Sequence, residues 1–381
     1  MDSKITNRIV MQTGMPQLFS TLAEELSPSD LQSLLLSVYK ARVREAHERD
    51  VLARARQNSL FVPSSVDVRL LNKFDSLAFD VASQFDLVDL SPVCPLGTTS
   101  LLGGIDQNNL LTTIRNAEVL GDSTPAMALE CARRRKASAD RQTRPVRLCA
   151  SHRVVRLQPF DGPHLTPHFQ LLTLVSAGRD VGSNLFEIQY LSEHIHFYLR
   201  LFRALNTEHF SLANPLVEIS DLGVTELLLD AAGISRQTIR QTIRAHRPGD
   251  SERFFAAQGI TLPKDITNPD LELKDLTERH GFRMQFSRLV QLKEQLIDPL
   301  QAEYAEARFR FNLARLEGLG YYTGLCVRIS PIAPDGVRYS IVDGGMTNWT
   351  ARLLQDNKER LLTTGIGSEF VCKQYRAATS P

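Results

Sequence analysis

Two Val- and Leu-rich segments separated by a short polar loop constrain the fold of this chain more than any other feature. The segments cover residues 146–158 and 168–178, and the loop from Pro159 to Pro167 contains Pro and Gly. Such residues favour a turn, while runs of Val and Leu of this length favour strands. The pattern predicts two antiparallel strands, whose apolar side chains must be covered by other elements.

Signals on both sides of this pair indicate an α+β fold. Apolar residues recur at helical spacing over 66–85, and Phe85 to Leu90 then alternates with period two, which predicts a half-buried strand ending at Pro92. Further elements are expected as a helix at 184–205, strands at 321–329 and 339–342, and a turn at Asp343-Gly344-Gly345 that leads into a closing helix.

These patterns divide the chain into four segments. Residues 1–60 are expected to form a helical N-terminal extension, and 61–210 the first part of the core. Residues 211–310 are polar and mostly helical, with a break at Pro248-Gly249, and are interpreted as a helical insertion. Residues 311–381 are expected to complete the core.

Charge and cysteine content exclude several function classes. The 44 basic and 43 acidic side chains balance, which makes nucleic acid an unlikely partner. The five cysteines show no pairing spacing, as expected for reduced thiols, and no apolar run is long enough to span a membrane. The N-terminus has no signal-peptide pattern, so a cytoplasmic location is expected.

Four stretches in order resemble the catalytic core of histidyl-tRNA synthetase, a class II aminoacyl-tRNA synthetase, and its relative, the regulatory subunit of ATP phosphoribosyltransferase. The first, from Phe61-Val62-Pro63 to Pro92, resembles motif 1, which usually builds a homodimer interface. The second, Gly121 to Ala128, is similar to the loop and helix start that present a carboxylate and a threonine to the amino group of histidine.

The third stretch, Arg147 to Arg156 with His168-Phe169-Gln170, resembles motif 2, which handles ATP. The fourth, Leu316 to Gly324 followed by Asp343-Gly344-Gly345, resembles the histidine-specific R-G-L-D-Y-Y-T-G and the later G-G-R-Y-D. The resemblance covers roughly 60–375. It implies a class II synthetase-like antiparallel sheet flanked by helices, with the helical insertion and the N-terminal extension added.

Departures from the family pattern fall at its ATP contacts. Val155 stands where motif 2 has a glutamate, Glu317 replaces an arginine and Gly320 an aspartate, and 365–372 lacks the motif 3 arginine. An acid in place of a cation reverses a favourable Coulomb energy, and each lost contact costs on the order of 2–4 kcal/mol. The resemblance therefore implies loss of adenylation. The anticodon-binding domain is also expected to be absent.

The resemblance marks ten residues as a candidate ligand site. They are Asp122, Thr124, Arg153, Phe169, Gln170, Glu317, Tyr321, Tyr322, Gly344 and Gly345.

Each of these residues also has a structural interpretation. Asp122 and Thr124 suit an ammonium ligand, but also a helix N-cap. Arg153 suits a phosphate or carboxylate, but also an ordinary place in a sheet.

The aromatic and glycine candidates leave similar alternatives open. Phe169 is placed either to stack on a ring or to pack in the core. Tyr321 and Tyr322 are expected on a strand, on opposite faces, with one towards a pocket. Gly344-Gly345 permits either close approach to a ligand or a tight turn. The histidines show no metal-ligand spacing, so neither a metal nor a cofactor is expected.

The preferred interpretation is a homodimeric paralogue that does not charge tRNA. It would bind a small amine-bearing ligand, such as an amino acid, and regulate or scaffold a partner enzyme. The lost ATP contacts make catalysis the less favoured alternative. In that alternative the chain is an enzyme with a rebuilt pocket for amino-acid ligation or acyl transfer, with Glu317 and Asp122 as acid and base. A tRNA-related factor is a third, weaker alternative.

Overall fold

A computed structural model describes most of the chain. The described ranges are 2–138, 144–158, 166–231, 250–259 and 283–377, with a few single positions between 233 and 274. The break at Pro248-Gly249 and residues 159–165 of the expected loop lie outside them.

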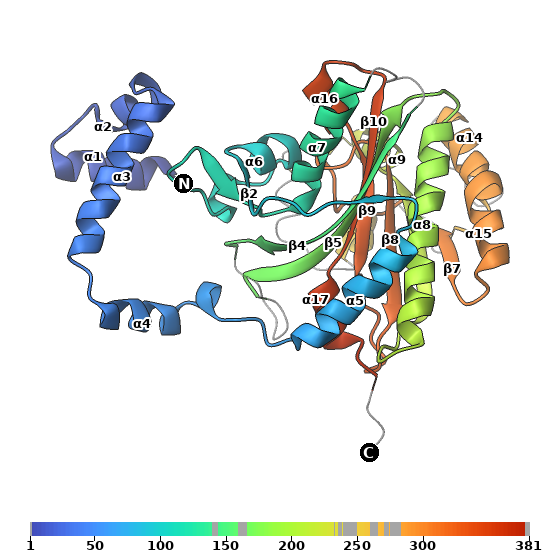
Figure 1. The fold of residues 1–381 in the computed structure, drawn as a ribbon. Coiled ribbons are helices and arrows are strands. Elements are labelled where there is room, and N and C mark those ends of the chain that lie inside the picture. Colours follow the sequence, from blue (N-terminus) through green and yellow to red (C-terminus); the bar gives the residue numbers. More distant parts are fainter. Residues whose placement is uncertain are drawn as a thin grey trace.

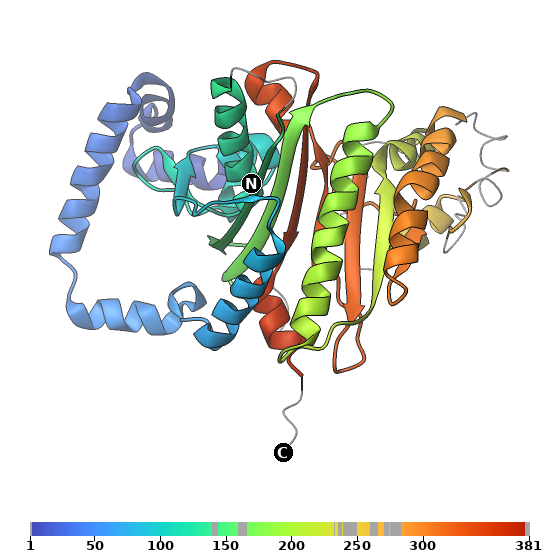
Figure 2. The same ribbon diagram turned by 45° about the vertical axis from the view of Figure 1, so that its right-hand side comes forward.

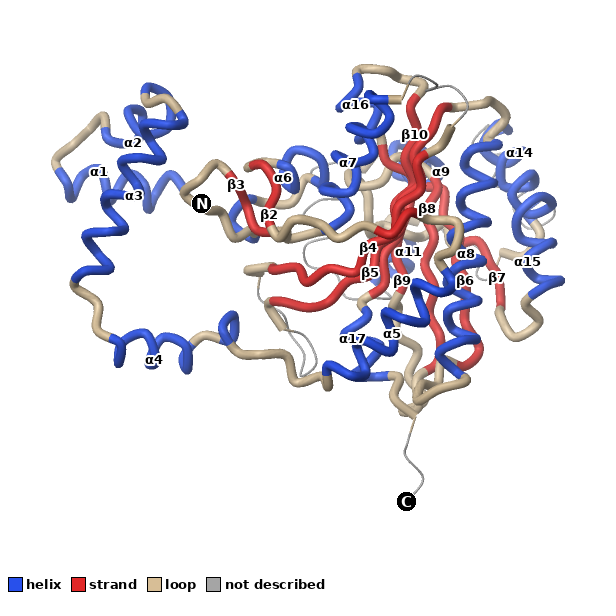
Figure 3. Tube along the Cα trace, in the orientation of Figure 1, coloured by secondary structure: helices blue, strands red, loops and turns tan. Residues whose placement is uncertain are grey.

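An eight-stranded sheet forms the centre of the molecule, and helices cover both of its faces (Figures 1 and 3). Its strands, in spatial order, are β1 (Asp86–Leu87), β4 (Val146–Val155), β5 (His168–Arg179), β10 (Glu359–Ile366), β9 (Val342–Thr347), β8 (Leu325–Ile332), β6 (Ala213–Asp221) and β7 (Arg308–Phe311). Only the two outer pairs, β1 with β4 and β6 with β7, are parallel. The expected antiparallel pair is β4 and β5, and the predicted α+β class is confirmed.

Alternation along β4 and β5 separates two apolar layers. Leu148 and Val175 pack on one face, against α7 (Ser123–Ala137) and α16 (Trp349–Leu354). Cys149 and Leu174 pack on the other face, with the helices α5 (Val68–Val81), α8 (Leu185–Asn206) and α17 (Ser368–Gln374). Successive side chains of a strand point to opposite faces, so one hairpin supplies both layers. A small ribbon of β2 (Val93–Pro95) and β3 (Ala117–Val119) lies beside α6 (Thr98–Gly103).

The N-terminal segment is helical, as expected, and extends away from the sheet (Figure 2). Its helices are α1 (Asp2–Thr13), α2 (Leu18–Ser20), α3 (Pro28–Arg44) and α4 (Glu48–Gln57). α3 has an N-cap at Ser27, whose side chain accepts a hydrogen bond from the Asp30 backbone N–H at 3.2 Å. Neither α3 nor α4 buries a side chain. The segment therefore adds little to the core.

Four sequence predictions differ from the structure. The strand expected at 339–342 begins only at Val342 and continues to Thr347 as β9. The expected helical insertion at 211–310 begins too early, because β6 pairs with β8 and β7 inside the sheet. The strand expected at 321–329 begins only at Leu325. The turn expected at Asp343-Gly344-Gly345 is instead part of β9. In each case long-range pairing decided the boundary, which local propensity alone does not specify.

Gly344 is required by the close approach of β10. A Cβ atom at Gly344 would lie 2.3 Å from the Thr364 Cγ2 atom and 2.5 Å from the Thr363 carbonyl oxygen. At Gly345 it would lie 2.8 Å from the Cys326 Sγ atom. Neither a ligand nor a turn explains these glycines, because the chain's own strands fill the space.

We predict that Gly344→Ala lowers the free energy of unfolding by roughly 1–3 kcal/mol or more, because the neighbouring backbone must shift. Gly367→Ala is the matched control, since its Cβ would meet only the Phe370 Cβ atom at 3.5 Å and should change stability by less than about 1 kcal/mol. Urea denaturation measures both. Equal midpoints for the two variants would contradict the packing argument.

Candidate functional site

Asp122 lies at the N-terminus of α7 and is surrounded by partners from its own chain. Its Oδ1 atom accepts hydrogen bonds from the Thr124 backbone N–H at 2.9 Å and the Thr124 hydroxyl at 2.8 Å. Its Oδ2 atom accepts one from the Tyr321 hydroxyl at 3.0 Å and lies 3.3 Å from the Arg156 Nη2 atom. Asp122 is therefore an N-cap, and its other oxygen is already paired.

Tyr321 and Tyr322 are brought together, rather than separated on opposite faces of a strand. Both precede β8, in a loop where Gly318 has a φ of 93°, and their ring centroids lie 4.8 Å apart. The Tyr321 hydroxyl lies 2.7 Å from the Thr124 hydroxyl, whereas the Tyr322 hydroxyl donates to the Asp343 Oδ2 atom at 3.0 Å. Burial and the nearby carboxylates raise the pKa of both phenols well above the usual value. Both stay neutral donors.

A second cluster surrounds the carboxylate of Glu369, whose side chain is 1% exposed. Its Oε1 atom accepts from the Ser64 hydroxyl at 2.6 Å and lies 2.9 Å from the Lys373 Nζ atom. Its Oε2 atom lies 2.9 Å from the Arg153 Nη1 atom and accepts from the Gln170 backbone N–H at 3.2 Å. Burial raises its pKa, but these hydrogen bonds and cations together hold the pKa below its usual value.

Arg153 also contacts His168, and the two contacts of the imidazole ring indicate which of its nitrogens carries the proton. Arg153 Nη1 lies 3.0 Å from the His168 Nδ1 atom, and His168 Nε2 lies 2.8 Å from the Val62 carbonyl oxygen. Because a carbonyl oxygen only accepts, Nε2 carries the proton and Nδ1 accepts from Arg153. Two of the candidate residues, Arg153 and Gln170, are thus anchored by protein groups. Phe169 lies under the Arg156 guanidinium, 5.7 Å from ring centroid to Cζ.

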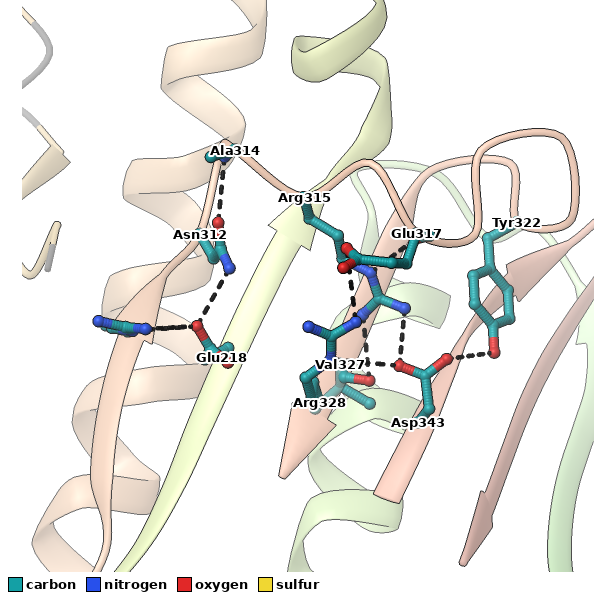
Figure 4. A network of polar contacts seen from close by, with 10 residues as sticks. Glu218, Asn312, Ala314, Arg315, Glu317, Tyr322, Val327, Arg328 and Asp343 are labelled. Carbon is teal, nitrogen blue, oxygen red and sulfur yellow. Dashed lines mark hydrogen bonds and ion pairs between the residues drawn. The ribbon is translucent and has the colours of Figure 1, made fainter. Parts of the chain in front are cut away.

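The third cluster centres on Asp343 and the buried Arg315 (Figure 4). The Arg315 Nη2 atom donates to Asp343 Oδ1 at 2.7 Å, and its Nε atom donates to the Glu317 carbonyl oxygen at 2.8 Å. Burial opposes the charge, but the facing Asp343 carboxylate keeps the pKa of Arg315 raised. Arg328 stands on the neighbouring strand, with its Nε atom 3.7 Å from Asp343 Oδ1.

Arg328 changes the electrostatic argument made for Glu317. Its Nη2 atom lies 3.6 Å from the Glu317 Oε2 atom, so the acid has a cationic neighbour (Figure 4). The expected unfavourable Coulomb energy at Glu317 is therefore offset within the chain. Sequence reasoning missed Arg156, Arg315 and Arg328. Arg328 is the direct cross-strand partner of Asp343, and only the register of β8 against β9 reveals this pairing.

All five cysteines are buried free thiols, as the sequence indicated. Within the described ranges, no group of three or more His, Cys, Asp or Glu side chains is placed to hold a metal ion. None of the helices in the described part of the chain is long and apolar enough to cross a membrane.

Three solved structures share this architecture. One is an ATP phosphoribosyltransferase regulatory subunit/histidyl-tRNA synthetase from Bacillus halodurans C, with a TM-score of 0.59, 16% identity and 82% of each chain covered. Histidyl-tRNA synthetase from Nostoc sp. PCC 7120 has a TM-score of 0.58 and 17% identity, and the match covers 82% of this chain and 73% of that one. A histidine–tRNA ligase subunit from Alicyclobacillus acidocaldarius subsp. acidocaldarius DSM 446 has a TM-score of 0.59 and 18% identity, and the match covers 80% of this chain and 91% of that one.

The chain therefore has a class II aminoacyl-tRNA-synthetase-like core. More particularly, its fold is that of the histidyl-tRNA synthetase structures, as the four sequence stretches implied. No protein-family model matches the chain, and no curated protein matches its sequence. At this level of identity the likeness concerns the fold.

We predict that Glu369→Gln lowers the free energy of unfolding at pH 7 by roughly 1.5–3 kcal/mol, because Arg153 and Lys373 lose a charged partner. The pKa of Glu369 in the folded state is lower than that of an ordinary glutamate. Its stabilisation is therefore full above the ordinary pKa and is lost as the pH falls through the folded-state pKa.

Urea denaturation at pH 7 and at successively lower pH measures this effect, with the exposed Glu294→Gln as the control. The difference between the parent protein and Glu369→Gln should shrink as the pH falls. A difference that stays constant down to the acid unfolding transition would contradict the assignment.

Proposed function

We propose that this chain is a non-charging paralogue of histidyl-tRNA synthetase that serves as a regulatory or scaffold subunit for a partner enzyme. One observation carries the proposal. Every cation described in the three clusters pairs with a carboxylate of the same chain: Arg153 and Lys373 with Glu369, Arg156 with Asp122, and Arg315 and Arg328 with Asp343.

A nucleoside triphosphate is held by cations that are available to its phosphates. Here a triphosphate would have to separate existing ion pairs, one of which involves a carboxylate that is 1% exposed. Breaking such a pair leaves a buried charge without compensation, which costs several kcal/mol. The internal pairing therefore favours a protein that acts by binding a partner rather than by catalysis. The proposed regulatory role rests on similarity to the Bacillus halodurans protein, which is named as an ATP phosphoribosyltransferase regulatory subunit/histidyl-tRNA synthetase.

The same pairing limits the amine-bearing ligand in this proposal. An ammonium group at Asp122 would have to replace the Tyr321 hydroxyl or the Arg156 guanidinium at the Oδ2 atom. A rebuilt enzyme with Asp122 and Glu317 as acid and base meets the same obstacle, because both carboxylates have internal partners. The scaffold form is therefore preferred. We place the protein in the cytoplasm, where its five thiols stay reduced.

A homodimer built on the segment around Pro92 is part of the proposal. Exposed apolar side chains gather along this segment, among them Leu87 (52%), Val93 (41%) and Leu101 (71%). Apolar side chains at this density are typical of a surface that another chain covers. The two copies would be related by a two-fold axis, as in most homodimers.

If the chain does not charge tRNA, it should not adenylate histidine. Purified protein should catalyse no histidine-dependent exchange of pyrophosphate into ATP, because the arginines that could meet its phosphates, Arg153 and Arg156, are already paired with carboxylates. A histidyl-tRNA synthetase assayed in parallel provides the positive control. Exchange at a comparable rate would overturn the non-charging assignment.

The proposed dimer interface can be tested by placing charges on it. Leu87→Asp together with Val93→Asp should raise the dimer dissociation constant by at least about 100-fold, because two charges would be buried without partners. Val337→Asp is the control, since Val337 is similarly exposed at 46% but lies in a distant hairpin. Light scattering at micromolar concentration measures the mass. A parent protein that is already monomeric would contradict the proposed interface.

A further inference from the structure

A polar pocket of about 590 Å³ lies at the other end of β5 and β10 from Glu369. Its walls come from several parts of the chain. Among them are the loop after β5 with Asp180, the first turn of α8 with Glu187, α14 (Arg283–Leu292) with Arg288, the end of β9 with Thr347, and the start of β10 with Arg360. This volume lies in the range of small-molecule sites.

Three buried polar atoms in these walls have no hydrogen-bond partner in the protein. They are the Glu187 Oε2 atom, the Arg288 Nε atom and the Thr347 Oγ1 atom. Thr347 is 3% exposed, and the side chain of Glu187 is 12% exposed. Buried polar atoms are nearly always paired, since leaving one unpaired is costly. Three such atoms from three elements around one pocket indicate a partner from outside the chain.

The walls carry charges of both signs, from the acids Asp180, Glu187 and Glu359 and the arginines Arg288 and Arg360. Arg360 lies 2.6 Å from Asp180, measured from Nη2 to Oδ2, and its Nε atom lies 3.6 Å from the Glu187 Oε1 atom. The Arg288 Nη1 atom lies 3.4 Å from the Asp221 Oδ2 atom. A simple anion or a simple cation would therefore meet repulsion as well as attraction in this pocket.

The unpaired atoms indicate a ligand that carries both a positive and a negative group. Glu187 Oε2 is an acceptor for an ammonium group, and Arg288 Nε–H is a donor for a carboxylate. The Thr347 hydroxyl can donate or accept. We propose that this pocket binds a small zwitterion of the free amino-acid type. The inference goes beyond the proposed function and does not depend on it, because none of these residues belongs to the Asp122, Glu369 or Asp343 clusters.

The test uses the full-length protein and the twenty free L-amino acids as probes. A thermal-shift screen comes first, because a ligand that binds only the folded state raises the unfolding temperature. Calorimetric titration of each hit follows, with glucose as an uncharged polar probe. At least one amino acid should raise the unfolding temperature and bind, and glucose should do neither.

Two variants assign the binding to this pocket. Glu187→Gln removes the negative charge with little change of shape. Thr347→Val removes the unpaired hydroxyl and leaves a side chain of nearly the same size. Each should weaken binding at least ten-fold. Because Thr347→Val removes a buried unpaired group, the unbound variant should be at least as heat-stable as the parent. This outcome separates a binding role from a structural one.

Glu193→Gln is the matched control. Glu193 lies on the same helix, is 13% exposed and pairs with an arginine (Arg147, 3.2 Å), but faces a different pocket. Its substitution should leave binding unchanged. Three results would overturn the inference: no amino acid binds, glucose binds as well as the amino acids do, or binding survives in both variants. Loss of binding in Asp122→Asn alone would also overturn it. Pyrophosphate exchange is measured separately, so its result bears only on the proposed function.

Discussion

The carboxylate of Glu369 joins parts of the chain that are far apart in sequence. It contacts Ser64 before the first core helix, Arg153 on β4, the backbone of Gln170 on β5, and Lys373 one helical turn away. A buried carboxylate is tolerated when several donors and cations replace its water. Here four groups do so. The entry of the chain into the core, the central hairpin and α17 thus meet at one charge.

Asp122, which is buried, and Asp343, which is half-exposed, also have partners from their own chain. Each acid pairs with an arginine and accepts a tyrosine hydroxyl, so Tyr321 and Tyr322 connect one loop to two clusters. In this arrangement the polar groups pair with one another instead of with a ligand. A site built in this way gains rigidity, because each member is held by its neighbours. The unpaired polar atoms at Glu187, Arg288 and Thr347 lie at a different end of the sheet, around one pocket.

A fold can persist when little of the sequence is shared. The matched structures are 16–18% identical to this chain, yet they align over 80–82% of it. What such a sheet demands is alternation of apolar residues along β4 and β5, and small residues where strands approach closely. Gly344 and Gly345 meet the second demand, because Cβ atoms there would overlap β10 and β8. At other positions of the sheet many different apolar residues pack equally well, so the fold can persist at low sequence identity.

The sequence by itself determined the α+β class and the β4–β5 hairpin, because these depend on patterns within neighbouring segments, and it left Asp122 open between a ligand contact and a helix cap. It also named ten candidate site residues, through motifs and their order. Only the tertiary structure decided that β6 belongs to the sheet and that Asp343 lies within a strand. Only the structure paired Arg328 with Asp343 and Arg153 with Glu369. Those pairings depend on strand register and on contacts between distant segments, which local spacing does not encode.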